Sequence, residues 1–300
     1  MGNDFSRREF LATAATVAAG IAAGVAADAP GEPIIDIHQH TNYSGRTDAQ
    51  LIAHQKALGV TTSVLLPAGR LYGLDADCGR NDTVLALAKK HSQFVFFANE
   101  ITDVPAAREE ITKYLKLGAI GIGEQKFRVA CDSPEFQGVA ELAQEFGGPV
   151  LMHFMHNQYN TGIERFHKVL EKFPKVNFIG HAQTWWGNVD KNHEQKAMYP
   201  TTKVTPGGIT DRLLSDHPNM YGDLSAGSGL NFFTRDEDHA RAFLERHQDK
   251  LMFGSDCNDI FGRGPGCQGA NILANIRKLA PTKVIERKIL FGNAKRVMKL

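Results

Sequence analysis

Short apolar runs alternate with amphipathic stretches along most of the chain. Several of these runs are continuous, as in Val64-Leu65-Leu66 and Phe94-Val95-Phe96-Phe97. Continuous apolar runs are typical of parallel strands that are covered on both faces. The pattern predicts eight strands, at Pro33–His38, Thr61–Leu66, Phe94–Asn99, Ala119–Glu124, Pro149–His153, Asn177–His181, Met220–Leu224 and Leu251–Gly254.

Apolar positions between these runs recur at helical spacing. They predict helices at Ala49–Leu58, Asp82–His91, Ala106–Leu117, Phe136–Phe146, Ile163–Phe173, Asp236–Arg246 and Asn271–Leu279. Strands that alternate with helices form parallel βα units, and eight such units close a barrel. The sequence therefore predicts an α/β protein with a (β/α)₈ TIM barrel, and no low-complexity linker divides the region from Pro33 to Leu300.

The first thirty residues have a different character. Ser6-Arg7-Arg8-Glu9-Phe10-Leu11 precedes a mildly apolar run from Ala12 to Ala27, and this order resembles a bacterial twin-arginine export signal. Ala27-Asp28-Ala29 offers small residues at the spacing that signal peptidase reads. The alternative is an uncleaved anchor, which the many alanines and glycines disfavour. We expect residues 1–29 to be an export signal, residues 30–300 to be the barrel domain, and the twin-arginine machinery to carry the protein to the periplasm.

Composition narrows the function classes. The chain has 300 residues, 42% of them hydrophobic, and a formal net charge of +1. That balance gives no electrostatic reason to expect a nucleic-acid partner. The four cysteines are Cys78, Cys131, Cys257 and Cys267, and no CxxC spacing occurs. A cysteine metal site is therefore not expected; Cys257 and Cys267 could close a short disulfide loop, or all four cysteines could be free thiols.

Ligand-type residues fall at the ends of separate predicted strands. These residues are His38 and His40 on the first strand, Glu124 on the fourth, His153 on the fifth, His181 on the sixth and Asp256 after the eighth. Active sites of TIM barrels lie at the C-terminal ends of the strands. Six nitrogen and oxygen ligands at that end can hold one or two divalent ions, with Zn²⁺ expected and Mn²⁺ or Fe²⁺ as alternatives.

These motifs give the chain a clear resemblance to a known family. The first-strand HxH, the histidines that end strands five and six, and Gly254-Ser255-Asp256 resemble the amidohydrolase superfamily, in particular its amidohydrolase-2 branch. The tail Ile289-Leu290-Phe291-Gly292-Asn293-Ala294-Lys295-Arg296 is also similar to the closing helix of that branch. The resemblance covers nearly all of Pro33–Leu300, and it implies hydrolysis by water activated on a metal ion.

The resemblance also implies roles for the ligand residues. His38, His40 and Asp256 would hold a first metal, His153 and His181 a second, and Glu124 would bridge them. Lys126, on the same strand face as Glu124, is the alternative bridge. In relatives with one metal, His181 would orient or deprotonate water instead. Asp256 would act both as a ligand and as the group that shuttles the proton.

Three further residues are candidates for binding substrate. Trp185 and Trp186 open a long stretch after the sixth strand and could form an apolar wall, or they could pack that stretch onto the rim of the barrel. Arg263 in a glycine-rich loop could bind an anionic group of the substrate, or it could be solvated. Asp223 could support the site from behind, whereas His54 and most other histidines are expected on the outer helices.

The leading functional hypothesis is a metal-dependent hydrolase acting on an amide, ester or lactone bond of a small molecule. A metal-dependent decarboxylase or hydratase is the first alternative, and arginines that clamp a carboxylate would favour it. A non-catalytic binding protein on the same scaffold is the second alternative, because a fold by itself does not establish an activity.

Overall fold

The computed structural model describes residues 31–69 and 77–300, so the expected export signal lies outside the described residues. Within them, the chain from Pro33 onward forms one compact unit. Its eight strands are β1 (Ile35–Gln39), β2 (Thr62–Leu65), β3 (Phe94–Phe96), β4 (Ile122–Gln125), β5 (Val150–His153), β6 (Phe178–His181), β7 (Met220–Asp223) and β8 (Leu251–Met252). The eight predicted strands are confirmed.

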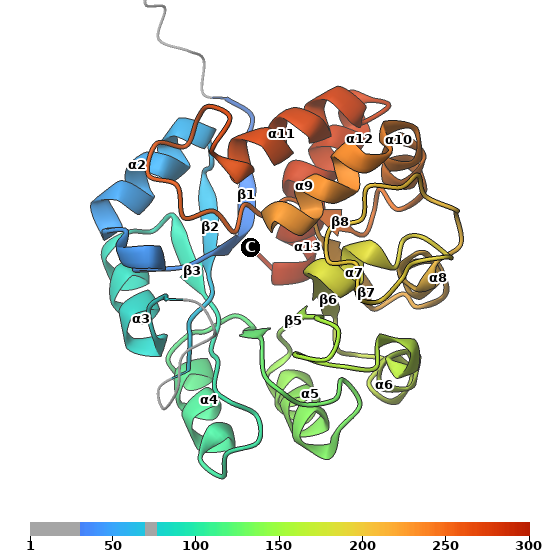
Figure 1. Cartoon of the computed structure of the whole chain (residues 1–300). Coiled ribbons are helices and arrows are strands. Elements are labelled where there is room, and N and C mark those ends of the chain that lie inside the picture. The colour runs from blue at the N-terminus through green and yellow to red at the C-terminus, as the bar shows by residue number, and fades with distance from the viewer. Residues whose placement is uncertain (1–30, 70–76) are drawn as a thin grey trace, which may run out of the picture. The chain divides into compact units, whose positions relative to one another are not determined.

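Helices follow the strands and lie around them (Figure 1). The α-helices are α2 (Asp48–Leu58), α3 (Asn81–Lys90), α4 (Ala107–Lys116), α5 (Pro134–Phe146), α6 (His167–Lys172), α7 (Gln183–Gly187), α8 (Ile209–Asp216), α9 (Ala226–Arg235), α10 (Glu237–Arg246), α11 (Gln268–Leu279), α12 (Lys283–Arg287) and α13 (Asn293–Met298). The seven predicted helices are among them, while α7, α8, α9 and α12 were not predicted. None of the described helices has the length and apolar character needed to cross a membrane.

Local sequence signals set the helix ends. Thr47 and Gln50 form a reciprocal capping box at the start of α2, and Ser133 caps α5 ahead of Pro134. Both helices end at a glycine in the left-handed region, Gly59 or Gly147. The capping side chains and the left-handed glycines provide hydrogen bonds for backbone groups that helix ends leave without partners.

All strand pairs are parallel and fall into two sheets, β1-β2-β3 and β4-β5-β6-β7-β8. Backbone hydrogen bonds cross both seams between the sheets. Ile120 N donates to Phe96 O (2.9 Å) and Ala98 N to Gly121 O (2.9 Å) at one seam, and Ile37 N donates to Phe253 O (3.1 Å) at the other. The α/β TIM-barrel fold is therefore confirmed, with continuous ladders inside each sheet and only short hydrogen-bonded links between the two sheets.

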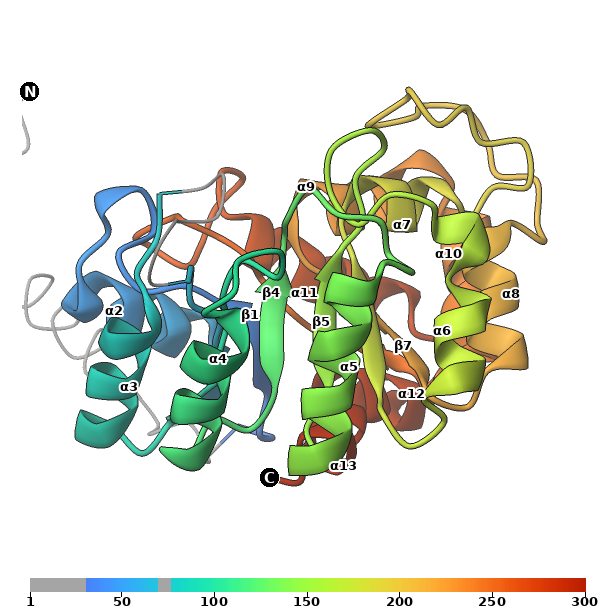
Figure 2. The ribbon, with the colours of Figure 1, turned by 90° about the horizontal axis from the view of Figure 1, so that it is seen from below.

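Two apolar layers hold this arrangement together. One lies between the strands and the outer helices, where Val150 and Met152 pack with Phe136 and Leu170. The other is the interior cluster, which α13 closes at the end opposite the long loop that follows α7 (Figure 2). The interior cluster comprises Ile35, Ile37, Val64, Leu66, Phe97, Leu151, Ile179, Tyr221, Met252, Ala294, Val297 and Met298.

A register shift in β1 allows neighbouring residues of this strand to point both into the interior cluster and toward the ligand residues at the end of the barrel. Asp36 pairs with Ser63 and Gln39 with Leu65, so three steps along β1 match two steps along β2. Such a bulge breaks the strict alternation of side chains. Ile37 joins the interior cluster, and the next residue, His38, also points toward the barrel axis.

A similar shift occurs in β4. Ile122 pairs with Val150 and Gln125 with Met152, which leaves Gly123 and Glu124 in the irregular segment. Gly123 has a φ of +141°, and a Cβ atom there would lie 2.8 Å from the Leu151 carbonyl oxygen. Only glycine fits this position without strain, and the segment turns Glu124 inward.

Replacing Gly123 by alanine should therefore destabilise the protein. We expect the Gly123→Ala substitution to lower the free energy of unfolding by about 1–3 kcal/mol, because the new Cβ meets backbone in a strained conformation. Urea denaturation followed by circular dichroism measures the change. Gly138→Ala is the matched control: Gly138 lies in α5 with no atom within 4 Å of an added Cβ, so that variant should gain about 0.5–1 kcal/mol. Equal stability of the wild type and Gly123→Ala would contradict the prediction.

Candidate metal centre

The six predicted ligand residues meet at one end of the barrel. Glu124 lies at the centre: its Oε2 atom is 3.6 Å from His38 Nε2 and 3.7 Å from His40 Nε2. Its other oxygen, Oε1, is 2.5 Å from His153 Nδ1 and 3.7 Å from His181 Nε2. The Glu124 carboxylate thus lies within 3.7 Å of four imidazoles. They are His38 on β1, His40 directly after β1, His153 on β5 and His181 on β6.

Asp256 covers this group from the loop after β8. Its Oδ1 atom lies 3.4 Å from His40 Nε2 and 3.7 Å from His38 Nε2, and its Oδ2 atom lies 3.6 Å from His181 Nε2. The Asp256 backbone N–H donates to His38 O at 2.9 Å, which fixes the loop against β1. Asp256 therefore faces the same nitrogen atoms as Glu124, from the other side.

Polar groups behind three of the histidines fix their orientation. His38 Nδ1 lies 2.7 Å from Asp223 Oδ2, and His181 Nδ1 lies 3.3 Å from the same oxygen. Ser225 Oγ donates to Asp223 at 2.7 Å. His40 Nδ1 donates to the Leu66 carbonyl oxygen at 2.7 Å. An Nδ1–H held by a carboxylate or carbonyl directs Nε2 toward the centre, where an ion can take the place of its proton, and this is the arrangement found behind metal-binding histidines.

The burial of these groups produces strong electrostatic coupling. Burial lowers the pKa of His38, but the negative charges of Asp256 and Asp223 outweigh burial and raise that pKa well above its ordinary value. Burial raises the pKa of Asp223, yet His38 and His181 outweigh it and lower the pKa to about 2. The pKa values of Glu124 and Asp256 are lowered in the same way, by His153 and His38 for Glu124 and by His38 and His40 for Asp256. The carboxylates are therefore anionic at neutral pH.

His153 is held differently. Burial lowers its pKa to about 4 despite the opposing effect of Glu124, so the ring is neutral at neutral pH. Its Nδ1–H donates to Glu124 Oε1, and its Nε2 atom is buried without a hydrogen-bond partner among the described residues. A neutral imidazole with an unpartnered lone pair is ready to accept an ion or a ligand N–H.

The donor set fits a divalent cation. Asp256 Oδ1 is buried and has no hydrogen-bond partner among the described residues, and His38 Nε2 lies 3.2 Å from His40 Nε2. A cation among these atoms would satisfy groups that are otherwise costly to bury. Among the six ligand residues, two triplets have ligand atoms within 4.8 Å of one another: His38, His40 and Asp256, and His38, Glu124 and His181.

The first triplet is the one expected for the first metal. The second differs from expectation, since His38 stands where His153 was predicted. The reason is that His153 directs Nδ1, not Nε2, toward Glu124. Because both triplets use the single free nitrogen of His38, the arrangement fits one ion among these residues.

Glu124, not Lys126, lies among the histidines. The Lys126 ammonium is instead 5.7 Å from the centre of the Tyr159 ring, which also contacts His153 and Arg128. Tyr43 was missed by the sequence analysis: its ring lies 5.0 Å from that of His40, and the charge of Asp256 raises the pKa of its hydroxyl. The sequence signal that could have indicated Tyr43 was its position three residues after His40, just beyond the end of the first strand.

The structure places the two tryptophans in the core and corrects the suggestion that they form a substrate wall. Trp185 and Trp186 are 0% and 2% exposed. Trp185 stacks on Phe154 with ring centres 6.0 Å apart, and Trp186 packs on Phe232 at 4.6 Å. The short helix α7 turns both rings inward, where Trp186 Nε1 donates to Asp223 O at 2.9 Å.

Arg263 is exposed in the loop between β8 and α11. Within the part of the chain that the structure describes, no hydrogen bond or ion pair fixes it. Its role in binding substrate stays a prediction.

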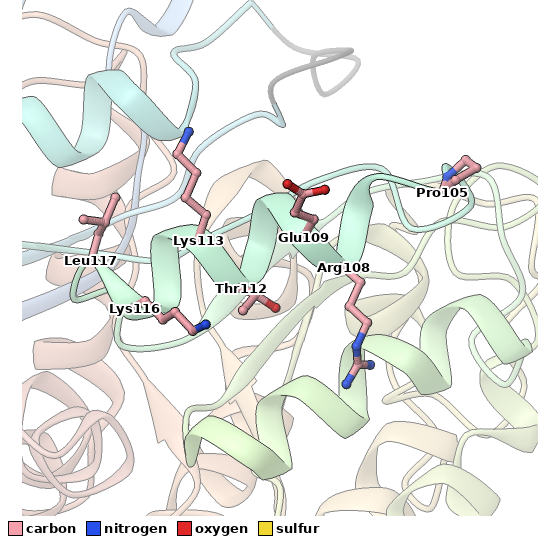
Figure 3. A pocket seen from close by; sticks show the side chains of 7 residues that line it. All are labelled: Pro105, Arg108, Glu109, Thr112, Lys113, Lys116 and Leu117. Carbon is pink, nitrogen blue, oxygen red and sulfur yellow. The ribbon is translucent and has the colours of Figure 1, made fainter.

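A surface hollow of about 790 Å³ lies elsewhere, along the outer side of α4 (Figure 3). Its lining residues belong to α4 or adjoin its ends: Pro105, Arg108, Glu109, Thr112, Lys113, Lys116 and Leu117. None of the six ligand residues contributes to it, so the hollow is separate from the candidate metal centre.

Comparison with known proteins adds a family. The model of an amidohydrolase family, Amidohydro_2, matches residues 35–300. A search of curated proteins gave no match.

Solved structures share the fold at low sequence identity. An uncharacterized TIM-barrel protein from Bordetella bronchiseptica is 17% identical with a TM-score of 0.63, covering 89% of this chain and 99% of that one. A 2,6-dihydroxybenzoate decarboxylase from Rhizobium is 14% identical with a TM-score of 0.60, over 89% and 99% of the two chains. An amidohydrolase from Burkholderia multivorans with bound zinc is 16% identical with a TM-score of 0.60, over 90% and 100%.

The contacts of Asp223 lead to a prediction about metal affinity. Asp223→Asn removes the negative charge that holds His38 and His181, so metal affinity should fall by about 10–100-fold. Competition with a chromogenic chelator measures the dissociation constant. Asp216→Asn, at an exposed carboxylate at the end of α8, is the control and should bind as the wild type does. An unchanged constant in Asp223→Asn would show that this carboxylate does not tune the site.

Proposed function

This chain belongs to the amidohydrolase family whose model matches residues 35–300, and we propose that it is a metal-dependent hydrolase of an amide, ester or lactone bond in a small molecule. One divalent ion, with zinc as the first choice, is proposed at the centre formed by His38, His40, Glu124, His181 and Asp256. His153 completes the wall of the site beside Glu124.

The placement of Asp256 is the observation that carries the proposal. Its side chain is 11% exposed, against 0–8% for the side chains of the other five ligand residues. It therefore faces both the buried nitrogens and the open end of the barrel. A carboxylate in that position can contact the ion with one oxygen and a water molecule or substrate with the other.

The reaction needs a group that moves one proton. When bound, a divalent ion would polarise the substrate oxygen and make water more acidic, with Zn²⁺ lowering the pKa of water from about 15.7 to about 7. Asp256 accepts the proton that the attacking water loses. It then donates the same proton to the departing nitrogen or oxygen, so the carboxylate is regenerated at the end of the cycle.

Neighbouring side chains hold Asp256 and the histidines ready for that task. Tyr43 keeps its hydroxyl proton, because the nearby charge of Asp256 raises its pKa, and it can donate to Asp256 or to a substrate oxygen. Asp223 and Ser225 keep the His38 and His181 rings oriented from behind. These contacts fix the Nε2 atoms before any substrate arrives, which reduces reorganisation during the reaction.

A decarboxylase is the second candidate, motivated by the fold shared with the Rhizobium 2,6-dihydroxybenzoate decarboxylase. That chemistry calls for a cation to hold the substrate carboxylate. Arg46 is buried beside the site, but its Nη1 already donates to Cys257 O at 2.7 Å and to Asp259 O at 3.0 Å, and its Nη2 donates to His40 O at 3.2 Å. Lys126, half-buried near His153, and Arg263, exposed in the loop after β8, are the candidates for that role, and in the described part of the chain neither contacts the six ligand residues. We therefore place hydrolysis first.

The Asp256→Asn variant tests the proposal. It keeps the size and one acceptor oxygen of the side chain but removes its basicity. We expect kcat on the best substrate of an amide, ester and lactone panel to fall by about 10²–10⁴-fold, with much of the metal retained. Steady-state kinetics and elemental analysis of the same preparation provide the two readouts.

Two further variants make that result interpretable. His38→Ala should lose metal as well as activity, whereas Asp238→Asn, at an exposed carboxylate on α10, should match the wild type. Near-wild-type turnover in Asp256→Asn would move the proton-transfer role to another group. Release of carbon dioxide from a carboxylated aromatic, with no hydrolysis of any panel member, would favour the decarboxylase.

We also propose that residues 1–29 direct export to the periplasm through the twin-arginine route. The support is the pair Arg7-Arg8 ahead of a weakly apolar run and the small residues at Ala27 and Ala29. This route carries proteins that fold and load metal before they cross the membrane.

Replacing both Arg7 and Arg8 by lysine tests the route. The double variant should remain in the cytoplasm at precursor length, because the machinery reads the arginine pair. Fractionation of cells and immunoblotting measure the distribution and the length. A Lys89→Arg/Lys90→Arg variant, altered at the end of α3, should be exported normally. Unchanged export of the arginine double variant would refute the assignment.

A further inference from the structure

A second cluster of potential metal ligands lies apart from the candidate metal centre. His54 of α2, Cys257 directly after Asp256, and Cys267 at the start of α11 bring one nitrogen and two sulfur atoms within 4.8 Å of one another. His54 and Cys267 are 0% exposed and Cys257 is 2% exposed. The sequence analysis set these residues aside, because the cysteines lack a CxxC spacing and His54 lies in a helix.

The distances within the cluster match a tetrahedral metal site. The two sulfur atoms are 3.8 Å apart, and Cys267 Sγ is 3.4 Å from His54 Nε2. Ligands around a tetrahedral zinc ion, at about 2.3 Å for sulfur and about 2.0–2.1 Å for nitrogen, lie roughly 3.5–3.8 Å from one another. A disulfide would instead hold the sulfurs at about 2.05 Å. Two of the three distances are therefore those expected between ligands of one ion, and His54 lies within 4.8 Å of Cys257 as well.

We propose that His54, Cys257 and Cys267 form a second metal site that takes a borderline or soft cation, Zn²⁺ in the first instance. Thiolate and imidazole are the ligands that zinc prefers, whereas Mg²⁺ and Ca²⁺ prefer oxygen. Binding forms two metal–sulfur bonds and one metal–nitrogen bond, and the two thiol protons pass to solvent. The fourth tetrahedral position is left for a non-protein ligand.

The surroundings favour such an ion. Leu58, Val60 and Ala270 pack against the two cysteines and make their surroundings largely apolar. A thiolate in an apolar setting is costly unless a cation neutralises it. Without an ion, Gln55 Nε2 donates to His54 Nδ1 at 3.3 Å, which leaves the ring proton on Nε2; coordination through Nε2 would move that proton to Nδ1 and replace this hydrogen bond.

This ion would tie three parts of the fold together. Cys257 follows Asp256 in the chain, and its carbonyl oxygen accepts hydrogen bonds from Gln39 Nε2 at 3.1 Å and Arg46 Nη1 at 2.7 Å. Cys267 begins α11, and His54 belongs to α2. The second site would thus fasten the loop that carries Asp256 to the helix that follows β1, which is a structural role.

Cobalt(II) is the probe that separates the two sites. A thiolate bound to Co²⁺ gives an intense near-ultraviolet charge-transfer band, whereas a site of imidazoles and carboxylates gives none. The full chain, freed of metal under reducing conditions and titrated with Co²⁺, should develop this band with a stoichiometry of one. Total metal should exceed that of a Cys257→Ser/Cys267→Ser variant by one equivalent.

Matched cysteine variants assign the band. Cys131→Ser removes another buried thiol, whose sulfur lies 3.0 Å from Gly162 O, and should keep the band. Cys78→Ser should also keep it, although Cys78 hydrogen-bonds to His40 of the candidate metal centre. A reduced wild-type protein without the band, a band that survives in the Cys257/Cys267 double variant, or a band lost in Cys78→Ser would overturn the proposal.

A second variant covers the case in which the Cys257/Cys267 double variant does not fold, as judged by circular dichroism. His54→Gln retains both thiols, and the affinity of this site for Co²⁺ should fall at least about tenfold. The band does not depend on catalysis. A failure of the proposed hydrolase activity therefore leaves this result unchanged, and the reverse also holds.

Discussion

The concentration of charge at the strand ends is the constraint on which the rest of the structure depends. Four imidazoles and the carboxylates of Glu124, Asp223 and Asp256 share a small volume from which water is largely excluded. Such a group is stable only if each charge has a partner of opposite sign and each ring has one fixed hydrogen bond. Much of the surrounding architecture supplies these partners: Leu66 O behind His40, Asp223 behind His38, and Trp186 holding the Asp223 backbone.

Much of this could be predicted from the sequence, and the exceptions have physical causes. The eight strands were predictable because buried parallel strands are continuous apolar runs. The strand-end ligands were predictable because the barrel brings all C-terminal strand ends together. The side-chain direction at His38 was not predictable by simple alternation: Ile37 points inward, so an unbroken strand would turn His38 outward. A bulge in the pairing of β1 with β2 turns His38 inward, and the sequence of β1 alone does not reveal how it pairs with β2.

The placement of the tryptophans and the cysteine cluster could not be predicted, for related reasons. Trp185 and Trp186 belong to a five-residue helix, too short to leave a periodic pattern, and that helix decides that both rings face the core. His54, Cys257 and Cys267 come from two helices and a loop that are more than 200 residues apart at their ends. Their proximity is a product of the closing of the barrel, in which β8 returns to β1. No local spacing encodes it.

The two-sheet division of the strands has a mechanical consequence. His38 belongs to the first sheet and His40 directly follows its strand β1, while Glu124, His181 and Asp256 belong to the second sheet or follow it. An ion held by both sets would clamp the halves together where the backbone ladders are interrupted. Its binding free energy would then add to the cohesion of the two half-barrels, by roughly 4 kcal/mol when the free ion exceeds its dissociation constant a thousandfold. Removing the ion would withdraw that contribution and leave the two sheets joined by the short hydrogen-bonded links at the seams, so the metal would have a structural role as well as a chemical one.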